Sequence, residues 1–435
     1  MSKRKTKKSR RVVIVDGVRT PFVRAFSEFL KLDTIGLGVE AAGGLIKKTG
    51  IARKELDGIM WGGVIFPGLA PNVGREIALD LKLPPSVTGM TCSMACTSGL
   101  RAITLAVSAI EHGEADVMIA GGSDSTSNTE IKLPQKVVHA MAPLAFGKAT
   151  PGDMLGVLSQ LMPITEILPK MPKIAERTTG EVMGEAAEKM GRRHEISREA
   201  QDAFAVASHH RAAAAIESGR MGQEIVDVHT PNGKHVYGDT MVRGDTSVEK
   251  LARLRPVFAR KGTLTAGNSC ALTDGASAVL LMTEEKAKAL GYTPLARFVD
   301  WQFSGVDPAD RLLMGPALAM PQVLRKTGLS LEQMDFVDIH EAFSAQVLAI
   351  TKMMASDAFA KEYLGHDKAA GEVDPEKLNV HGGSIAIGHP FGATGARMTT
   401  TMANELHQTG KQYALLGICA AGGLAVGAVL ENAEA

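Results

Sequence analysis

Two cysteines and one histidine lie on short turns rich in small residues, although they are far apart in the sequence. Cys96 is part of Ser-Met-Ala-Cys-Thr-Ser-Gly, His389 stands between a glycine and a proline, and Cys419 precedes Ala-Ala-Gly-Gly. A thiol can carry an acyl group as a thioester, and an imidazole or a second thiol can move the protons that the transfer requires. These residue types predict acyl-thioester chemistry.

Cys96 directly precedes a segment with helical periodicity that ends at Gly113. Its apolar residues recur on one face: Leu100, Ile103, Val107 and Ile110. Backbone N–H groups at the start of a helix stabilise a thiolate and an oxyanion formed when that thiolate attacks a carbonyl. We therefore expect Cys96 to be a nucleophile, whereas most free cysteines are inert buried residues. Cys92, four residues earlier, is interpreted as a packing residue.

Three further residues occupy comparable turns. Proline fixes the backbone after His389 and holds its ring rigidly, as a general base requires. Cys419 ends a predicted buried strand, and the small residues after it leave room for a ligand and a backbone donor. His340 lies between a predicted strand and helix, where a ligand can meet helix N–H groups. Each residue alone is more often structural, but their occurrence at matching turns favours a shared site.

The elements that must position these residues occur twice. A reactive turn, a helix, a glycine and a buried strand follow one another over residues 96–120 and again over 389–418. This pattern indicates an α/β fold with a duplicated βαβ-type unit, in which two sheets share layers of helices. We also expect strand 12–15 to end in a turn at Asp16-Gly17, and strand 117–120 to end at Gly121-Gly122.

The expected domain organisation has four parts. Residues 1–11 form a basic, disordered arm, residues 12–125 with 245–290 the first half, residues 126–244 a loop domain, and residues 291–435 the second half. The loop domain contains apolar residues at helical spacing and a segment broken by Pro163, Pro169 and Pro172. It either packs on the body or offers an apolar surface to acyl chains, a partner or a membrane. Its apolar residues are Met154, Leu155, Leu158, Leu161, Met162, Ile164, Ile167, Leu168 and Ile174.

Composition limits the class of protein. The chain has 435 residues, a formal net charge of +1, 45% hydrophobic and 22% charged residues, which is ordinary for a soluble globular protein of two or three packed units. The four cysteines are too few for a disulfide framework and fit a reducing compartment. With no secretory signal and no apolar stretch long enough to span a membrane, we expect a cytoplasmic location.

Other binding classes receive little support from the sequence. No Cys-x-x-Cys or His-x-x-x-His spacing predicts a metal site. The basic residues before Val12 form either a solubilising arm or a contact with an anionic membrane or nucleic acid. Because no aromatic residues interleave with them, we expect no nucleic-acid partner.

The chain resembles the thiolases, the family of 3-ketoacyl-CoA thiolase and acetyl-CoA acetyltransferase. The resemblance runs from residues 12–22 to Leu424. It implies a five-layer α-β-α-β-α body of duplicated halves with an inserted helical loop domain. It also implies a homodimer or tetramer that cleaves 3-ketoacyl-CoA with CoA in fatty acid β-oxidation. Further matching segments are 183–184, 250–258, 265–269, 272–276 and 382–384.

The resemblance implies a role for each reactive residue. Cys96 would attack the 3-keto carbon and become acylated, and His389 would activate it and help to bind the thioester oxygen. Cys419 would protonate the departing acetyl-CoA enolate and handle the incoming CoA thiol. His340 stands where many thiolases carry an asparagine that fixes a water in the oxyanion hole. We expect the backbone of Cys96 and of Ala421, where many members have glycine, to bind an oxyanion.

The resemblance also implies that CoA is a substrate and that no cofactor is permanently bound. Arg243 is expected near the nucleotide end of CoA. Cys270 stands where relatives often have a serine that contacts pantetheine, and a thiol is a weaker donor. The other expected CoA contacts are Met183, Phe258, Ala266, Ser269 and Phe343.

Some features are most similar to trifunctional-complex β subunits and bacterial fatty-oxidation thiolases. They are His340, Ala421 and the long loop domain, and they favour long or medium acyl chains, a hydratase/dehydrogenase α subunit as partner and a peripheral membrane contact. The alternatives are a biosynthetic acetoacetyl-CoA thiolase, a ketoacyl synthase-like condensing enzyme and a non-catalytic lipid-binding or scaffold protein. Cys419 argues against the synthase, and the complete set of reactive residues argues against the scaffold.

Overall fold

The computed structural model describes residues 10–131, 133–146, 152, 156–157, 161 and 175–434. The chain divides into a larger unit, residues 1–128 with 176–435, and a smaller unit, residues 129–175. The smaller unit contains helix α4 (Gln135–Phe146). Most of the apolar segment predicted there lies outside the described residues: Met154, Leu155, Leu158, Met162, Ile164, Ile167, Leu168, Ile174 and the three prolines 163, 169 and 172.

The first half of the larger unit is built on five strands in the order β4-β3-β5-β8-β1. Strand β3 is parallel to β4 and β5, whereas β8 is antiparallel to β5 and β1. A short strand, β2 (Val23–Arg24), also pairs with β8. The bounds of the five are β1 Val12–Arg19, β3 Gly58–Gly62, β4 Thr88–Cys92, β5 Val117–Ser125 and β8 Thr273–Thr283.

The second half repeats this plan with strands in the order β10-β11-β12-β9. Strand β10 is parallel to β11, β11 is antiparallel to β12, and β12 is antiparallel to β9. Strands β3, β5, β8 and β1 of the first half have the same directions in the same order. Strands β1 and β9 join the two strand sets into one sheet through a single residue pair, Ile14 with Ala296. The predicted duplication is therefore confirmed. The bounds are β9 Ala296–Gly305, β10 Phe336–Ile339, β11 Tyr413–Ala420 and β12 Leu424–Asn432.

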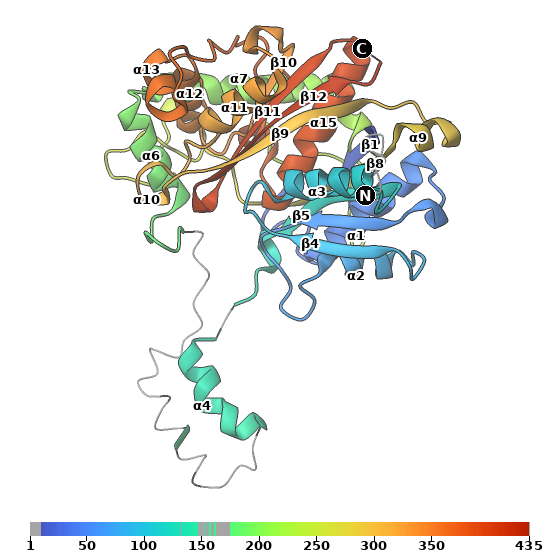
Figure 1. The fold of residues 1–435 in the computed structure, drawn as a ribbon. Coiled ribbons are helices and arrows are strands. Elements are labelled where there is room, and N and C mark those ends of the chain that lie inside the picture. The colour runs from blue at the N-terminus through green and yellow to red at the C-terminus, as the bar shows by residue number, and fades with distance from the viewer. Residues whose placement is uncertain are drawn as a thin grey trace, which may run out of the picture. The chain divides into compact units, whose positions relative to one another are not determined.

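Helices cover both faces of each half, which gives the five predicted layers. Helices α1 and α2 pack on one face of the first half, and α11 and α12 on one face of the second. Helices α3 and α15 form the shared middle layer, with α3 beside β5 and α15 beside β12 (Figure 1). Their bounds are α1 Thr34–Thr49, α2 Val73–Asp80, α3 Ser98–His112, α11 Pro316–Thr327, α12 Ser344–Met354 and α15 Thr394–Thr409.

Side-chain alternation along the strands separates three apolar cores. On β5, Val117 and Ile119 point into the core around α1 and α2, whereas Met118 and Ala120 point into the middle layer. The middle core also takes Leu100 from α3 and Met398, Met402 and Leu406 from α15. Both halves therefore bury apolar surface against the same pair of helices.

Capping residues define several helix ends, including the predicted end at Gly113. Asp33 accepts a hydrogen bond from the Gly36 N–H at the start of α1, and Ser197 does the same for Ala200 at the start of α7. Such a cap is worth ~1 kcal/mol. Gly113 and Gly410 end α3 and α15 with positive φ. The remaining elements are α6 Met183–Arg193, α7 Arg198–Glu217, β6 Val228–His229, β7 His235–Val236, α8 Val248–Ala252, α9 Glu284–Leu290, α10 Pro308–Arg311, α13 Asp357–Phe359 and α14 Ser384–Ile387.

The turn predicted at Asp16-Gly17 and the strand end predicted at Gly121-Gly122 were both wrong. Strand β1 continues through Gly17 to Arg19, with a register shift between Ile14 and Asp16, and β5 continues through Gly121 and Gly122 to Ser125. A Cβ at Gly17 would overlap the Thr400 side chain of α15, and one at Gly122 would overlap the Gly392 carbonyl. These glycines permit close packing of the middle layer instead of reversing the chain.

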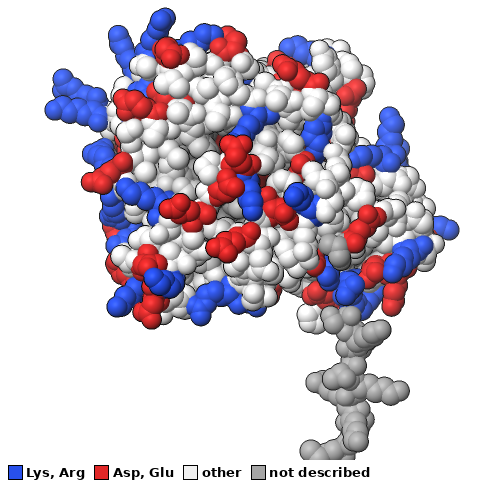
Figure 2. Space-filling view, turned by 90° about the horizontal axis from the view of Figure 1, so that it is seen from above, with Lys and Arg blue, Asp and Glu red and all other residues white. Residues whose placement is uncertain are grey.

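The charged surface shows no segregation by sign on the face drawn in Figure 2, where basic and acidic side chains alternate. Arg10 and Arg11, assigned to the basic arm from sequence, form ion pairs with Asp116 and Glu284 in the structure. Residues 1–9 of the arm lie outside the described residues. Among the described helices, none has both the length and the sustained apolar character that crossing a membrane requires.

Candidate active site

A strained turn presents Cys96 at the start of α3. Ala95, the residue before it, has φ +50°, a conformation that residues with a Cβ adopt at a cost of ~1–2 kcal/mol. The Ser98 hydroxyl holds this turn closed, because it accepts from the Met94 N–H at 2.8 Å and donates to the Ala95 carbonyl at 2.6 Å. Strain that is stabilised in this way is typical of functional sites.

The structure brings His389 into contact with Cys96. The His389 Nε2 lies 3.1 Å from the Cys96 Sγ, and its Nδ1 lies 2.6 Å from the Thr394 Oγ1. When the Nδ1–H donates to Thr394, Nε2 has a lone pair free to accept the thiol proton. The His389 backbone N–H also donates to the Thr273 hydroxyl at 3.0 Å. The ring is thus contacted at both nitrogens and its backbone is fixed, in the orientation of a general base.

Burial keeps this pair neutral. It lowers the pKa of His389 to about 3, with the Arg397 charge acting in the same direction. Cys96 keeps some solvent exposure, but burial raises the pKa of its thiol to about 12, although the N–H groups of Ala421 and of Cys96 itself oppose the rise. The stabilisation of a thiolate that we expected from the helix start is therefore outweighed by desolvation. Proton transfer must accompany attack on the substrate.

His340 stands beside His389, and their ring centroids are 4.1 Å apart. Its backbone N–H donates to the Gly417 carbonyl at 2.8 Å, and its Nδ1 lies 3.0 Å from the Ser384 Oγ. Burial, then the neighbouring His389 and Arg397, hold its pKa well below the usual range. Its Nε2 is buried and finds no hydrogen-bond partner among the described residues. Such an atom is normally satisfied by a ligand or a water.

Cys419 and the turn after it complete the cluster. Burial, then the nearby Cys96 and Cys270, raise the pKa of Cys419 well above its usual range, which places three thiols around one site. The backbone N–H of Ala421 opposes the rise in the pKa of the Cys96 thiol, which places this predicted oxyanion donor near the nucleophile. The next N–H, that of Gly422, donates to the Glu176 carboxylate at 2.8 Å. Glu176 therefore fixes the turn that aims the Ala421 N–H.

A groove of about 440 Å³ has Cys270 in its lining, whereas Cys96, His340, His389 and Cys419, which are all described, are not among its lining residues. Burial and then the nearby Cys96 raise the pKa of the Cys270 thiol, so the groove lies beside the thiol cluster. The lining of the groove is mostly apolar, with cationic side chains from Arg24 and Arg243. The backbone N–H of Arg243 donates to the His209 Nδ1 at 3.2 Å. Such a shape and polarity fit a long thioester ligand with an anionic end. Four of the predicted CoA contacts line it: Arg243, Phe258, Ala266 and Ser269.

Two predicted CoA contacts stand behind the groove rather than in its lining. Phe343 packs edge-on against Phe258, with ring centroids 5.7 Å apart. Met183 packs on the apolar core of the second half. Phe343 therefore supports the Phe258 wall, whereas Met183 belongs to the core of the second half.

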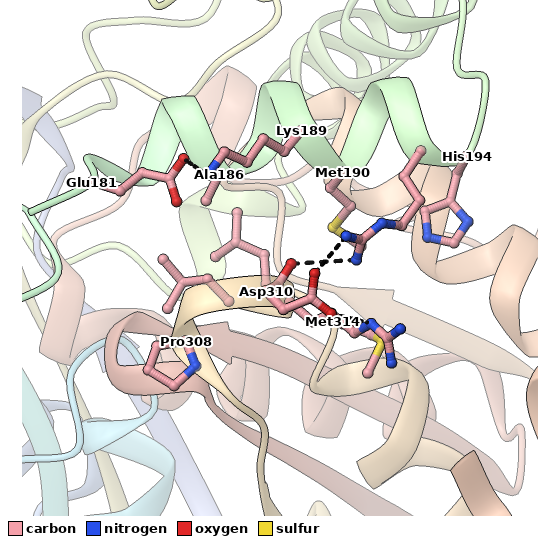
Figure 3. A pocket seen from close by; sticks show the side chains of 12 residues that line it. Glu181, Ala186, Lys189, Met190, His194, Pro308, Asp310 and Met314 are labelled. Atoms are coloured by element: carbon pink, nitrogen blue, oxygen red, sulfur yellow. Dashed lines mark hydrogen bonds and ion pairs between the residues drawn. The ribbon is translucent and has the colours of Figure 1, made fainter. Parts of the chain in front are cut away.

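A second pocket lies away from this chemistry, between α6 and the segment from Pro308 to Met314 (Figure 3). Its volume is about 20 Å³, which holds roughly one water. Ion pairs of Glu181 with Lys189 and of Arg193 with Asp310 surround it. All predicted site residues are described, and none of them is among its lining residues. It is too small for an acyl-CoA.

Sequence reasoning missed the residues that orient the reactive ones: Thr394, Ser384, Thr273, Glu176 and Asp124. Asp124 accepts backbone N–H bonds from Val64, Ile65 and Gly392, and so ties the segment after His389 to the first half. Burial raises its pKa to about 7, and these N–H groups limit the rise. The only signal for Thr394 and Ser384 was their closeness in sequence to His389.

Comparisons with known proteins agree along the whole chain. The model described as "Thiolase, N-terminal domain" matches residues 12–285, and that described as "Thiolase, C-terminal domain" matches residues 292–432. The 3-ketoacyl-CoA thiolase of Pseudoalteromonas translucida is 42% identical over 431 residues, with 99% of this chain and 98% of the relative covered. That of Alteromonas mediterranea is 41% identical over 429 residues, with 98% of both chains covered.

A solved structure is similar to this chain over nearly the whole of its length. Human mitochondrial 3-ketoacyl-CoA thiolase in complex with CoA superposes with a TM-score of 0.81 at 29% identity, covering 97% of this chain and 98% of the other. The duplicated five-layer fold, two matching family models and relatives above 40% identity converge. This chain therefore belongs to the thiolase family.

Proposed function

We propose that this chain is an acetyl-CoA C-acyltransferase, which cleaves 3-ketoacyl-CoA with CoA to give acetyl-CoA and a shortened acyl-CoA. The observation that carries the proposal is the 3.1 Å contact between the Cys96 thiol and the His389 base. A groove of about 440 Å³ is lined by Cys270, which neighbours both Cys96 and Cys419. Relatives named 3-ketoacyl-CoA thiolase support the degradative direction.

The first half-reaction forms an acyl-cysteine. His389 Nε2 takes the Cys96 proton while Sγ attacks the 3-keto carbon, and the N–H groups of Cys96 and Ala421 stabilise the resulting oxyanion. The oxyanion collapses, the C2–C3 bond breaks, and its electron pair passes to C2 as the acetyl-CoA enolate. Cys419 then gives its proton to C2. The unpartnered Nε2 of His340 is available to the enolate oxygen, directly or through a water.

The second half-reaction releases the product. The Cys419 thiolate takes the proton of the CoA thiol, and the CoA sulfur attacks the acyl-cysteine carbonyl. The same two N–H groups hold the second oxyanion. Its collapse expels the Cys96 sulfur, which regains a proton from the His389 imidazolium. The site returns to its neutral resting state, and the two-step course predicts ping-pong kinetics.

The finer assignments extend this proposal. Arg243 at the groove binds the phosphates of CoA, while Phe258 and Ala266 contact pantetheine; a related structure contains CoA. Long or medium acyl chains, at least a dimer and an α-subunit partner are proposed from the family features at His340 and Ala421 and from the loop domain.

A chain-length series on the purified full-length protein tests the proposal. We expect kcat/KM for thiolysis to be substantial for 3-ketodecanoyl-CoA. Activity on acetoacetyl-CoA alone contradicts the long-chain assignment, and carbon dioxide release from a malonyl thioester favours a synthase. Cys96→Ser is expected to keep the fold and abolish turnover, whereas the matched control Cys92→Ser is expected to retain it. A Cys96→Ser enzyme with near wild-type rate refutes the mechanism.

A further inference from the structure

The active site contains a set of metal-ligating atoms that no sequence spacing reveals. One ligand atom from each of Cys96, His340 and His389 lies within 4.8 Å of the other two. One thiolate and two neutral imidazoles are a donor set suited to Zn²⁺ and similar borderline-soft cations. The three residues lie on separate turns of the two halves, so a search for short motifs does not find them.

The surroundings of both histidines leave an inner nitrogen for a metal. The Ser384 hydroxyl engages the Nδ1 of His340 at 3.0 Å, and the Thr394 hydroxyl engages the Nδ1 of His389 at 2.6 Å. Outer hydrogen bonds of this kind orient histidine ligands in metal sites. His340 is only 1% exposed, and its Nε2 has no partner among the described residues. This buried, unsatisfied atom is an independent sign that something binds here.

The distances are close to those of a tetrahedral centre. Zinc bonds of ~2.3 Å to sulfur and ~2.0 Å to nitrogen place the donor atoms ~3.3–3.6 Å apart. The Cys96 Sγ and the His389 Nε2 are 3.1 Å apart, and no pair in the set exceeds 4.8 Å. Donor atoms up to 4.8 Å apart therefore have to approach one another by about an ångström to bind one ion. Three protein ligands leave a fourth position for water or a thiol.

We propose that Zn²⁺, or a comparable soft divalent cation, binds Cys96, His340 and His389 and reversibly blocks acyl transfer. On binding, the S–H bond of Cys96 breaks, a sulfur–metal bond forms, and the proton passes to solvent without redox change. The bound metal occupies the sulfur lone pair of the nucleophile and the Nε2 of the base. The inhibition rests on the proposed function, whereas metal binding does not.

Cobalt binding to the full-length, chelator-treated protein tests the site directly. Co²⁺ reports a tetrahedral site by its visible bands and a cysteine ligand by a sulfur-to-metal charge-transfer band. We expect one Co²⁺ per chain, displaced by Zn²⁺, in the wild type and in the matched control Cys92→Ser. Cys96→Ser is expected to lose the charge-transfer band, and His340→Asn, which removes an imidazole, to bind at least ~10-fold more weakly. Ser384→Ala is expected to weaken binding ~10-fold through the ring it orients.

The outcomes separate the two proposals. A charge-transfer band that persists in Cys96→Ser, or unchanged affinity in His340→Asn, overturns the metal site. Circular dichroism of both variants shows that the loss is not unfolding. We expect Zn²⁺ to inhibit thiolysis by the wild type and EDTA to restore it. A wild type that binds cobalt at this site but lacks thiolysis overturns the proposed function alone.

Discussion

The hydroxyl of Thr394 offers a sharp test of how His389 acts. Thr394 is fully buried at the start of α15, and its Oγ1 lies 2.6 Å from the His389 Nδ1. Thr394→Val keeps the shape of the side chain and removes the acceptor. The Nδ1–H then has no partner, and the tautomer with a free Nε2 toward Cys96 loses its support.

The magnitude follows from the charge that develops on the ring. A hydrogen bond between neutral groups contributes ~0.5–1.5 kcal/mol, and one to a charged group ~1.5–3 kcal/mol. His389 is neutral at rest and becomes an imidazolium as Cys96 attacks, so the Thr394 bond strengthens in the transition state. The difference of ~1–2 kcal/mol corresponds to a fall in kcat of ~5–30-fold. The buried, unpaired Nδ1–H also lowers the free energy of unfolding by ~1–3 kcal/mol.

Steady-state thiolysis at saturating CoA, together with urea unfolding, measures both effects. Thr394→Ser, which restores a hydroxyl, is expected to stay within ~2-fold of the wild-type kcat. Thr399→Val is the matched control, because its buried hydroxyl on the same helix donates to the Gly395 carbonyl at 2.9 Å. It is expected to lose stability and keep kcat. A Thr394→Val enzyme with wild-type kcat, or a Thr399→Val enzyme slowed equally, refutes the reasoning.

Three further predictions concern other parts of the site. Glu176→Ala removes the acceptor of the Gly422 N–H, and we expect kcat to fall ~10-fold with little change in KM for CoA, as measured by steady-state kinetics. Arg243→Ala is expected to raise the KM for CoA ~10-fold, and the effect is expected to shrink as salt increases. Burial lowers the pKa of His389 from 6.5 to about 3, so between these values the unfolded chain binds more protons and stability is lost as pH falls. In the wild type, His389 is expected to make the free energy of unfolding fall by up to ~1.4 kcal/mol for each pH unit below pH 6.5. His389→Asn is expected to lose this contribution to the slope, as measured by urea titrations at a series of pH values.

Each prediction has a clear contrary result. An unchanged kcat in Glu176→Ala means that the Ala421 turn is held without the carboxylate. A KM for CoA that is equal in Arg243→Ala and wild type removes Arg243 from the nucleotide site. Identical pH slopes for His389→Asn and wild type mean that the buried ring does not carry the acid sensitivity.

Structural features with a local physical cause could be predicted from the sequence. Gly113 was predicted to end its helix because a glycine can adopt the left-handed conformation of a C-cap, and the structure confirms it. Asp33, Ser197 and Gly410 mark helix ends by the same local chemistry. The repeated order of turn, helix and buried strand likewise predicted the duplicated fold. The approach of His389 to Cys96 followed from that repeat and from the family resemblance, since no local pattern joins residues so far apart.

Structural features that depend on contacts between distant segments could not be predicted from the sequence. Gly17 and Gly122 look like turn residues, but their role is to admit Thr400 and the Gly392 carbonyl. Glu176 and Asp124 resemble ordinary surface acids in the sequence, although both hold backbone N–H groups beside the reactive turns. The high pKa of Cys96 also depends on how completely the folded chain surrounds its sulfur.

The shared middle layer has a consequence for synthesis on the ribosome. Strand β1 emerges first, but its partner β8 is complete only after residue 283 has been synthesised. Helix α15, which packs on α3, is complete only after residue 409. Until then the nascent first half exposes the apolar face of α3 and of its sheet. Intermediates of this kind are prone to aggregate and are typical clients of chaperones. Substitutions that weaken α15 are therefore expected to reduce the yield of folded protein more than its final stability alone indicates.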